Sequence, residues 1–352
     1  MLTITDRIKA LCELGEWMLD YTHRWPRFNN EYEQLLMTCI RDRFIHNPYH
    51  TEPQVMKALT LWANKLSYSS IKSFVDGYSE LVPIRATHVA SIPRDNVPLS
   101  GIDDLVCILL AGHHYYCRNL NHEHDLMELL TKQLIIIEPK LSETIHWCSG
   151  FPKFVNAYLV SVKTENATFS QYLHKRQSLI REQRVSVAII RPEDSRKDYT
   201  LLGNDIFNFF GRSSYNVRKI YVPEQFSFKD FFESVENFSF VSLHNRYANN
   251  YDYQKSVLLM EREPILDNGF IILQESVKMM APIGCLYYEY YKNLDEVMMK
   301  LNVEKNQIQQ IVTNFDVLNS VKCGAAFDNP LWNFEDQKDT MRFLMNLEEI
   351  GR

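Results

Sequence analysis

The stretch that decides the fold is Thr87-His88-Val89-Ala90-Ser91-Ile92, which runs directly into the loop Pro93-Arg94-Asp95-Asn96-Val97-Pro98. The first six residues carry small and β-branched apolar side chains, a composition that predicts a short buried strand. Two prolines within the next six residues predict a loop. The apolar residues 101–110 then predict a helix that Ser100 could cap. A strand, a loop and a helix in this order form the first half of a parallel βα unit.

The same alternation continues on the C-terminal side of this unit. Apolar runs that resemble strands are separated by helical stretches; they cover 157–162, 185–190, 217–222, 269–273, 284–291 and 308–312. Residues 126–137 fit either a helix or a helix followed by a strand, since periodicity alone does not separate the two. Lys175, Arg176, Arg181 and Arg184 are interpreted as a solvated, basic helical face. The pattern as a whole predicts an α/β fold.

The N-terminal side of the strand looks different, because it shows only helical periodicity. Ile8, Leu11 and Met18 follow helical spacing, and Thr51-Glu52-Pro53 opens a later helix. Proline suits the first turn of a helix, where its missing N–H would have no partner in any case. We therefore expect residues 1–84 to form a helical segment.

Composition excludes several classes of protein. The 352 residues correspond to roughly two domains of about 150 residues each. Apolar residues make up 45% and charged residues 23%, which excludes collagen-like, low-complexity and disordered chains. The net charge of -6 argues against nucleic acid as a partner, because binding phosphates requires a basic surface.

The cysteines and the lengths of the apolar runs indicate in which cellular compartment the protein is expected. The seven cysteines are scattered without a CxxC pair, which favours reduced thiols over a disulfide framework and predicts no zinc site. No apolar run reaches 18 residues, and the first 21 residues carry several charges. We therefore expect a cytoplasmic protein with no signal peptide, no membrane insertion and no bound metal.

Four groups of residues carry a resemblance to a known family; they are 96–101, then 202–211 with 216–223, then 244–253 with 266–270, and finally 282–283, 286–291 and 339–344. In these stretches the chain resembles acyl-CoA reductases of the LuxC type, which are distant relatives of aldehyde dehydrogenases. The resemblance implies an aldehyde-dehydrogenase-like α/β fold, with a Rossmann-like cofactor domain over 85–192 and an α/β catalytic-type domain over 193–326. It also implies that a tail, 327–352, packs back or lies at an oligomer interface.

The family resemblance also implies a chemistry. Such enzymes reduce a fatty acyl thioester to an aldehyde with NADP or NAD as the cofactor. A cysteine thiolate attacks the acyl carbonyl, CoA leaves, and hydride reduces the enzyme-bound thioester. The expected partners are therefore acyl-CoA or another acyl thioester, together with a second copy of the chain or another protein.

The nucleophile position departs from the family pattern. Where relatives read Phe-Gly-x-Gly-Cys-x-Asn-Val, this chain reads Phe210-Gly211-Arg212-Ser213-Ser214-Tyr215-Asn216-Val217. Ser214 therefore stands at the cysteine position, and a hydroxyl is a weak nucleophile without an adjacent base. Either Ser214 fills an inactive site, or His244 activates it for acyl transfer or thioester hydrolysis. His244 could equally be a hydrogen-bonded structural residue.

The remaining candidate residues lie in the cofactor-type half. By resemblance, Asn96 would donate a hydrogen bond to the developing oxyanion, although an Asn before Pro98 also suits a turn. Arg118 stands where relatives use a Lys for the adenosine ribose or its 2′-phosphate, and Ile92 and Pro93 would border the cofactor. The list of cofactor candidates ends with Ser161 in Val160-Ser161-Val162-Lys163-Thr164, where relatives have a glycine-containing phosphate turn that this chain lacks. The two departures leave two classes open, an acyl-thioester enzyme and a non-catalytic binding protein.

Overall fold

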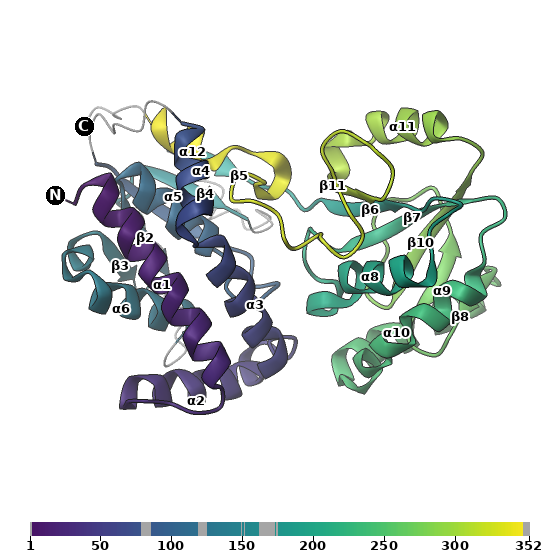
Figure 1. Ribbon diagram of the computed structural model, residues 1–352, viewed down its shortest axis with the longest axis horizontal. Coiled ribbons are helices and arrows are strands. Elements are labelled where there is room, and N and C mark those ends of the chain that lie inside the picture. The colour runs from purple at the N-terminus through teal and green to yellow at the C-terminus, as the bar shows by residue number, and fades with distance from the viewer. Residues whose placement is uncertain are drawn as a thin grey trace. The chain divides into compact units, whose positions relative to one another are not determined.

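The computed structural model describes residues 2–78, 86–118, 125–148, 150, 152–161, 173 and 175–347. The chain divides into two compact units (Figure 1). Unit 1 comprises Met1–Glu182 together with Pro330–Arg352, and unit 2 comprises Gln183–Asn329. In the part of the chain that the structure describes, none of the helices combines the length and apolar character needed to cross a bilayer.

Unit 1 begins with four helices, α1 (Ile4–Arg24), α2 (Glu31–His46), α3 (Glu52–Lys65) and α4 (Tyr68–Asp76). Thr3 and Asp6 form a reciprocal capping box at the start of α1, which satisfies two of the backbone N–H groups that a helix leaves unpaired there. Leu11, Leu14 and Met18 are buried along one face of α1. Through this face α1 packs against α3 and against the helices that cover the sheet.

The sheet of unit 1 is entirely parallel and has the strand order β3-β2-β1-β4-β5. Its strands are β1 (His88–Ile92), β2 (His114–Arg118), β3 (Ile145–Cys148), β4 (Ala157–Val160) and β5 (Gln177–Ile180). The connecting helices are α5 (Ile102–Ala111), α6 (Leu126–Ile137) and the short 3₁₀ helix η1 (Pro139–Glu143). The first strand, its loop and its helix thus match the predicted βα unit, and the ambiguous residues 126–137 form one helix. The expected cap by Ser100 is wrong, because Gly101 is the N-cap of α5 and the Ser100 hydroxyl donates to the carbonyl oxygen of Val97 instead.

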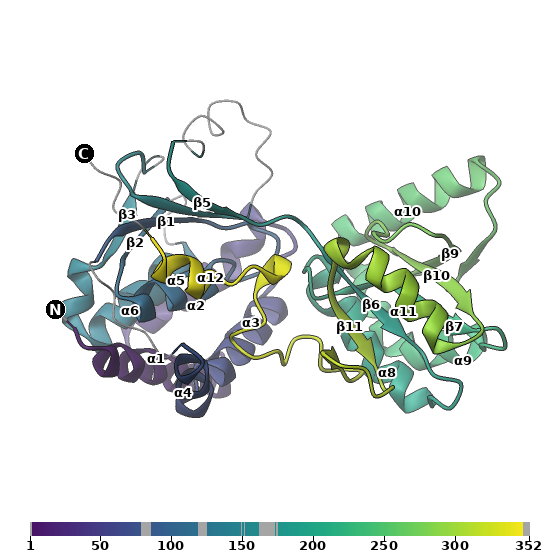
Figure 2. The ribbon, with the colours of Figure 1, turned by 90° about the horizontal axis from the view of Figure 1, so that it is seen from above.

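The C-terminal segment returns to unit 1. It contains the 3₁₀ helix η5 (Glu335–Gln337) and α12 (Thr340–Met345), which packs on α5 (Figure 2). The ring of Phe334 lies against Phe74 of α4, with 6.0 Å between the centroids. The imidazole Nε2 of His113 donates to the carbonyl oxygen of Leu344 over 2.9 Å. Residues 330–347 therefore complete the core of unit 1.

Unit 2 is also an α/β structure. Its seven-stranded sheet has the strand order β12-β11-β6-β7-β10-β9-β8. All neighbouring strands are parallel except β8 and β9. The strands are β6 (Val185–Ile189), β7 (Val217–Pro223), β8 (Ile265–Asp267), β9 (Ile272–Glu275), β10 (Cys285–Tyr291), β11 (Ile308–Thr313) and β12 (Ser320–Val321). The helices are α8 (Arg196–Phe207), η2 (Asn208–Gly211), α9 (Phe228–Val235), η3 (Glu236–Leu243), α10 (Asn245–Met260), α11 (Leu294–Val303) and η4 (Lys305–Gln307).

One strand of unit 2 is displaced from its predicted position. A strand was expected over 269–273, but β9 begins at Ile272. Gly269 has a φ of 95°, and the Asn268 side-chain oxygen accepts hydrogen bonds from the N–H groups of Phe270 and Ile271. These contacts form a turn, which keeps the first residues of the apolar run out of the sheet.

Candidate active site

The loop that carries Ser214 begins with three residues in the left-handed backbone region. Phe209, Phe210 and Gly211 have φ values of 52°, 54° and 72°. This conformation costs a bulky residue about 1–2 kcal/mol, so the surrounding packing must hold it. The ring of Phe209 lies 5.2 Å from that of Phe327, and the ring of Phe210 lies 4.5 Å from that of His244. Buried aromatic contacts therefore stabilise a reversal of the chain just before Ser214.

Asn216 holds the same loop through its side-chain amide. Its oxygen accepts the N–H of Ser213 over 2.8 Å. Its nitrogen donates to the carbonyl oxygens of Asp205, Ile206 and Asn208 at 3.0, 3.2 and 2.9 Å. Two of these carbonyls lie in the last turn of α8, where no intrahelical partner is left for them. The Asn-Val pair of the motif therefore has a structural role, since it ties the end of α8 to the start of β7.

Arg218 anchors the loop from the other side. It is buried in β7, and its guanidinium donates to the carbonyl oxygens of Gly211 and Ala281. Gly211 belongs to the left-handed stretch, and Ala281 precedes β10. Arg218 therefore fixes the two loops that flank the amino end of β7. Both Asn216 and Arg218 lie in a stretch that carries the family resemblance, but the sequence assigned no role to either.

Ser214 lies deep at the amino end of β7. Only 2% of its surface is exposed, and its carbonyl oxygen accepts a hydrogen bond from the Ser186 hydroxyl over 3.0 Å. The hydroxyl of Ser213, which occupies the position of a glycine in the family pattern, accepts the N–H of Tyr215 over 3.2 Å. The loop is thus closed by hydrogen bonds that involve its own polar groups.

His244, the predicted base for Ser214, belongs to the same unit and caps α10. Its Nδ1 accepts the N–H of Tyr247 over 3.3 Å. In the neutral imidazole, a proton must then sit on Nε2, so the basic lone pair faces the helix. A role for His244 as a base stays a prediction, and it requires the ring to leave this cap.

The two cysteines of unit 2, Cys285 and Cys323, do not offer a replacement thiolate. Both are buried, and burial raises the pKa of each to about 12. Because the thiolate is the nucleophilic form, neither is reactive at neutral pH.

Asn96, the predicted oxyanion donor, lies in unit 1, in a firmly held loop. Arg43 forms an ion pair with Asp95 at 2.9 Å, and Asn47 donates to the carbonyl oxygen of Asp95 over 2.7 Å. The Ser100 hydroxyl donates to the carbonyl oxygen of Val97 over 2.7 Å and lies 3.2 Å from the side-chain oxygen of Asn96. The structure thus places Ser214 and His244 in unit 2 and Asn96 in unit 1.

Ile92 and Pro93 precede this loop, and a glycine closes it. Ile92 ends β1, and its carbonyl oxygen accepts the N–H of Ser161 over 3.0 Å. Gly101 has a φ of 92°, and a Cβ placed there would lie 2.9 Å from the Pro93 ring. Only glycine therefore fits at 101, where the loop closes on Pro93.

Ser161, the candidate for phosphate binding, belongs to a buried charged network. Its hydroxyl accepts a hydrogen bond from Arg181 over 3.2 Å. Arg181 also donates to Asp104 over 2.6 Å and to the Thr340 hydroxyl over 2.7 Å. Asp104 accepts from the Ser91 hydroxyl over 2.6 Å. The network ties the ends of β1 and β4 to α5 and α12.

This network corrects the interpretation of a solvated basic helical face. Residues 177–180 form the strand β5, and Arg181 is only 3% exposed because it pairs with Asp104. Burial, reinforced by the charge of Asp104, raises the pKa of the neighbouring Asp103 to about 6. The nearest signal in the sequence was the pair Asp103-Asp104 at the start of a helix, but the sequence does not reveal their partner.

The other cofactor candidates are only partly described. Arg118 is the last residue of β2 and pairs with Cys148 of β3, but its side chain lies outside the described part of the chain. Val162, Lys163 and Thr164 also lie outside the described residues. What is described at the end of β4 does not fit a pyrophosphate turn, because the Ser161 hydroxyl is engaged by Arg181 and no glycine allows close approach.

Three histidines from adjacent strands of unit 1 stack on one another. The ring of His114 lies 4.9 Å from that of His88 and 5.9 Å from that of His146. Burial, followed by the charges of the neighbouring histidines, lowers the pKa of His88, and burial followed by the charge of His114 lowers that of His146. Among the residues that the structure describes, no group of three His, Cys, Asp or Glu is arranged to hold a metal ion.

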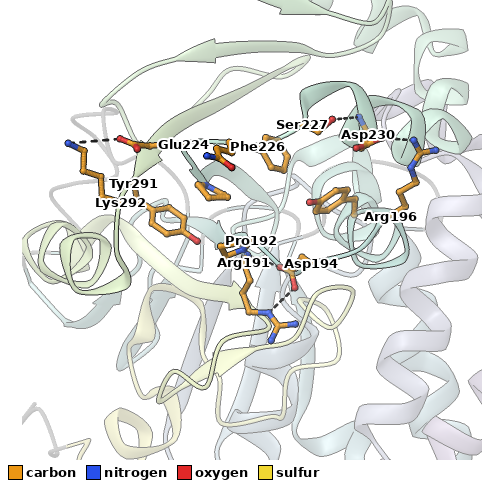
Figure 3. A pocket seen from close by; sticks show the side chains of 13 residues that line it. Arg191, Pro192, Asp194, Arg196, Glu224, Phe226, Ser227, Asp230, Tyr291 and Lys292 are labelled. Atoms are coloured by element: carbon orange, nitrogen blue, oxygen red, sulfur yellow. Dashed lines mark hydrogen bonds and ion pairs between the residues drawn. The ribbon is translucent and has the colours of Figure 1, made fainter.

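A cavity of about 630 Å³ lies at the carboxyl ends of β6, β7 and β10, all within unit 2 (Figure 3). Its rim carries three ion pairs, Arg191 with Asp194, Arg196 with Asp230, and Lys292 with Glu224. Ser214 precedes β7 and therefore belongs to the opposite edge of the sheet. Because each cation of the rim faces a carboxylate, the cavity has no excess charge that would select an anion.

Comparison with known proteins gives matches in structure alone. No protein-family model matches the sequence, and a search of curated proteins found no significant relative. Among solved structures, the chain is similar to a 3,6-anhydro-L-galactose dehydrogenase in complex with NAP, with a TM-score of 0.59, 10% identity, and 91% of this chain and 78% of that chain covered. It is also similar to aldehyde dehydrogenase 21 from Physcomitrella patens, with a TM-score of 0.58, 12% identity, and 98% of this chain and 89% of that chain covered.

A third similar structure is an NADP-dependent glyceraldehyde-3-phosphate dehydrogenase from Bacillus halodurans complexed with NADP, with a TM-score of 0.55, 10% identity, and 89% of this chain and 74% of that chain covered. The fold is that of the aldehyde dehydrogenases. The predicted aldehyde-dehydrogenase-like α/β fold is therefore confirmed. At such low identities the matches establish the aldehyde dehydrogenase fold alone.

Proposed function

We propose that this protein is a LuxC-type acyl-CoA reductase homologue that binds a fatty acyl thioester but does not reduce it, because Ser214 replaces the nucleophilic thiol. One observation carries the proposal. The loop before β7 keeps an elaborate set of contacts through Asn216 and Arg218, yet it holds a hydroxyl at the position where the family pattern has a thiol.

The chemical difference between the two groups is large. A cysteine has a pKa near 8.5 and is intrinsically very nucleophilic, whereas a serine needs an adjacent base to attack a carbonyl. Each tenfold loss of rate corresponds to about 1.4 kcal/mol of barrier. Cys285 and Cys323 do not compensate, because burial raises their pKa.

The nicotinamide cofactor is a separate part of the proposal. Structures with the same fold hold NAP or NADP, which supports a nicotinamide nucleotide as the ligand class of such a fold. The described end of β4 lacks a glycine turn, and its serine hydroxyl is engaged by Arg181. We therefore propose weak or absent binding of NADP and NAD, and we derive no hydride step.

A serine-based acyl transfer or thioester hydrolysis is the second candidate. It would use Ser214 as the nucleophile, His244 as the base and Asn96 as the oxyanion donor. The position of His244 near the loop, with its ring 4.5 Å from Phe210, favours this candidate. The hydrogen bond from Tyr247 to Nδ1 opposes it, because the lone pair is occupied.

Intact-mass measurement after incubation with dodecanoyl-CoA tests these assignments. We expect no adduct on the native protein and a dodecanoyl adduct on Ser214→Cys, with Ser213→Cys in the same loop as the matched control that stays unmodified. An adduct on the native protein that disappears in Ser214→Ala would establish serine acylation instead. If Ser214→Cys stays unmodified, the assignment of position 214 is wrong.

The cofactor half is tested independently. Titration with NADPH and NADH, followed by nicotinamide fluorescence, should show no binding in the micromolar range. Tight binding of either would contradict our proposal for the end of β4. Homodimerisation and a cytoplasmic location stay predictions.

A further inference from the structure

We propose that unit 1 carries a second binding site, separate from the Ser214 site, for a small organic anion with a carboxylate or phosphate head group and a short apolar body. The site is a cavity of about 350 Å³ between the start of α1, the loop before β2 and the 3₁₀ helix η1. This volume lies within the range of about 300–1,000 Å³ that is typical of small-molecule pockets.

The charge of the lining favours an anion. Arg7 and Lys140 contribute two permanent positive charges, and His113 and His114 add two imidazoles. Glu143 is the one carboxylate in the lining, and its backbone oxygen accepts a hydrogen bond from Nδ1 of His114 over 3.0 Å. Among the described residues, Arg7 and Lys140 form no direct ion pair, and the compensating charge that acts on both cations is that of the Asp6 carboxylate.

Arg7 supplies the donors. Its side chain is half-buried, and its Nη2 donates to the backbone oxygen of Leu2 over 2.7 Å. That is its one hydrogen bond to another described residue, although a guanidinium has five N–H donors. The preceding residue, Asp6, is engaged in the cap of α1, where it accepts from the N–H and the hydroxyl of Thr3 at 2.9 and 2.7 Å. A carboxylate or phosphate would match the unused donors of Arg7.

The walls define the rest of the ligand. Leu2, Leu109 and Leu141 are buried and line the cavity together with Ala86. His113 is fixed as a wall, because its Nδ1 accepts the N–H of Thr87 over 3.2 Å while Nε2 donates to the carbonyl oxygen of Leu344. A charged rim over leucine side chains favours an anion with a short apolar body over a bare inorganic ion.

The position separates this site from any cofactor site. Ala86 precedes β1, His113 precedes β2 and Thr144 precedes β3, so the cavity lies at the amino ends of three parallel strands. In open α/β sheets, nucleotides bind outside the carboxyl ends of the strands. A ligand here would occupy the opposite edge of the same sheet.

Calorimetric titration of the full-length protein at constant ionic strength tests the proposal, with sodium hexanoate and inorganic phosphate as separate probes. We expect saturable binding of at least one probe. Hexanoate should bind more tightly than phosphate, because its alkyl chain can contact the leucine side chains that line the cavity. Arg7→Gln should weaken binding at least tenfold. Lys9→Gln, which changes the same charge on an exposed position of the same helix, should leave binding unchanged.

Lys140→Gln provides a second test that does not depend on the fold tolerating the Arg7 substitution, since Lys140 is exposed. It should weaken binding severalfold, and the imidazole proton resonances of His113 and His114 should shift as the native protein is titrated. Equal binding by Arg7→Gln and Lys9→Gln, or no saturable binding of either probe at millimolar concentration, would overturn the proposal.

Discussion

The hydrogen bonds of Asn216 lead to a prediction about the stability of unit 2. In Asn216→Ala, the Ser213 N–H and the carbonyl oxygens of Asp205, Ile206 and Asn208 lose the partner described above. Asn216 is fully buried, so water does not readily replace the side chain. A buried polar group that loses its partner costs about 1–3 kcal/mol, and neighbouring losses are not additive. We therefore expect the free energy of unfolding to fall by about 3 kcal/mol.

The distribution of tryptophan makes this effect measurable. All five Trp residues, at positions 17, 25, 62, 147 and 332, lie in unit 1. Trp fluorescence in urea therefore follows unit 1, whereas far-UV circular dichroism also follows unit 2. Asn216→Ala should shift the dichroism transition to lower urea and leave the fluorescence transition in place. Hydrogen exchange should accelerate most in peptides that span 205–217.

Two further variants separate hydrogen bonding from loss of volume. Asn216→Asp keeps the shape and the acceptor for Ser213, but it directs a carboxylate oxygen at three carbonyls, so it should destabilise at least as much as the alanine variant. Asn29→Ala removes an amide side chain from an exposed position of unit 1 and should change stability by less than about 0.5 kcal/mol. An Asn216→Ala variant within 1 kcal/mol of the native protein, or an aspartate variant more stable than the alanine variant, would refute the reasoning.

Three other substitutions test the loops and the charged network of unit 1 by urea unfolding followed through Trp fluorescence. Arg181→Met leaves Asp104 buried without its cation and should destabilise unit 1 by about 3–5 kcal/mol; a loss below 1 kcal/mol would contradict this. Asp103→Asn should stabilise unit 1 at pH 7 and give no gain at pH 4. The pKa of the Asp103 carboxyl is about 6 in the folded protein and 3.8 in the unfolded chain, so its ionisation lowers the free energy of unfolding as the pH rises between those values. An equal effect at both pH values would show that Asp103 does not titrate in this window. Gly101→Ala should destabilise by about 2 kcal/mol or more, because its φ of 92° and a Cβ 2.9 Å from Pro93 both oppose a side chain; an unchanged midpoint would show that the loop can relax.

The sequence predicted those strands, helices and loops whose positions depend on the local pattern of apolar residues. The first βα unit and most strands of unit 2 follow from short apolar runs between loops, because burial on both faces of a parallel sheet leaves such runs in the sequence. In unit 1 the runs predicted only β1 and β4, and β2, β3 and β5 were missed. β9 was misplaced by three residues, since Asn268 forms a turn within an apolar run. The helical interpretation of the basic residues failed at Arg181 because its partner, Asp104, lies 77 positions away. Pairings across such a separation leave no periodic signal.

The position of the candidate site stays a prediction, and the structure adds the contacts that surround it. The family pattern located Ser214 and the loop before β7, whereas the roles of Asn216 and Arg218 depend on carbonyl groups of three separate segments. His244 shows the same limit, because a histidine beside an asparagine suits both a base and a helix cap, and only the hydrogen bond from Tyr247 separates the two. A sequence pattern can thus indicate which residue stands at a position. It does not indicate which of that residue's hydrogen-bond donors and acceptors are already paired within the protein.

Under the proposed function, the two departures from the family pattern have different consequences for the chemistry that a substitution could introduce. At position 214 serine and cysteine are nearly isosteric, and the contacts of Asn216 and Arg218 are made with other residues of the loop and its surroundings. A single substitution could therefore restore the thiol without rebuilding the loop. At Ser161 the hydroxyl is integrated with Arg181, Asp104 and Thr340, so restoring a glycine turn would disturb a buried ion pair and the docking of α12. We therefore expect Ser214→Cys to gain thiol chemistry more readily than any single substitution gains cofactor binding, and we expect acylation of that variant without reduction.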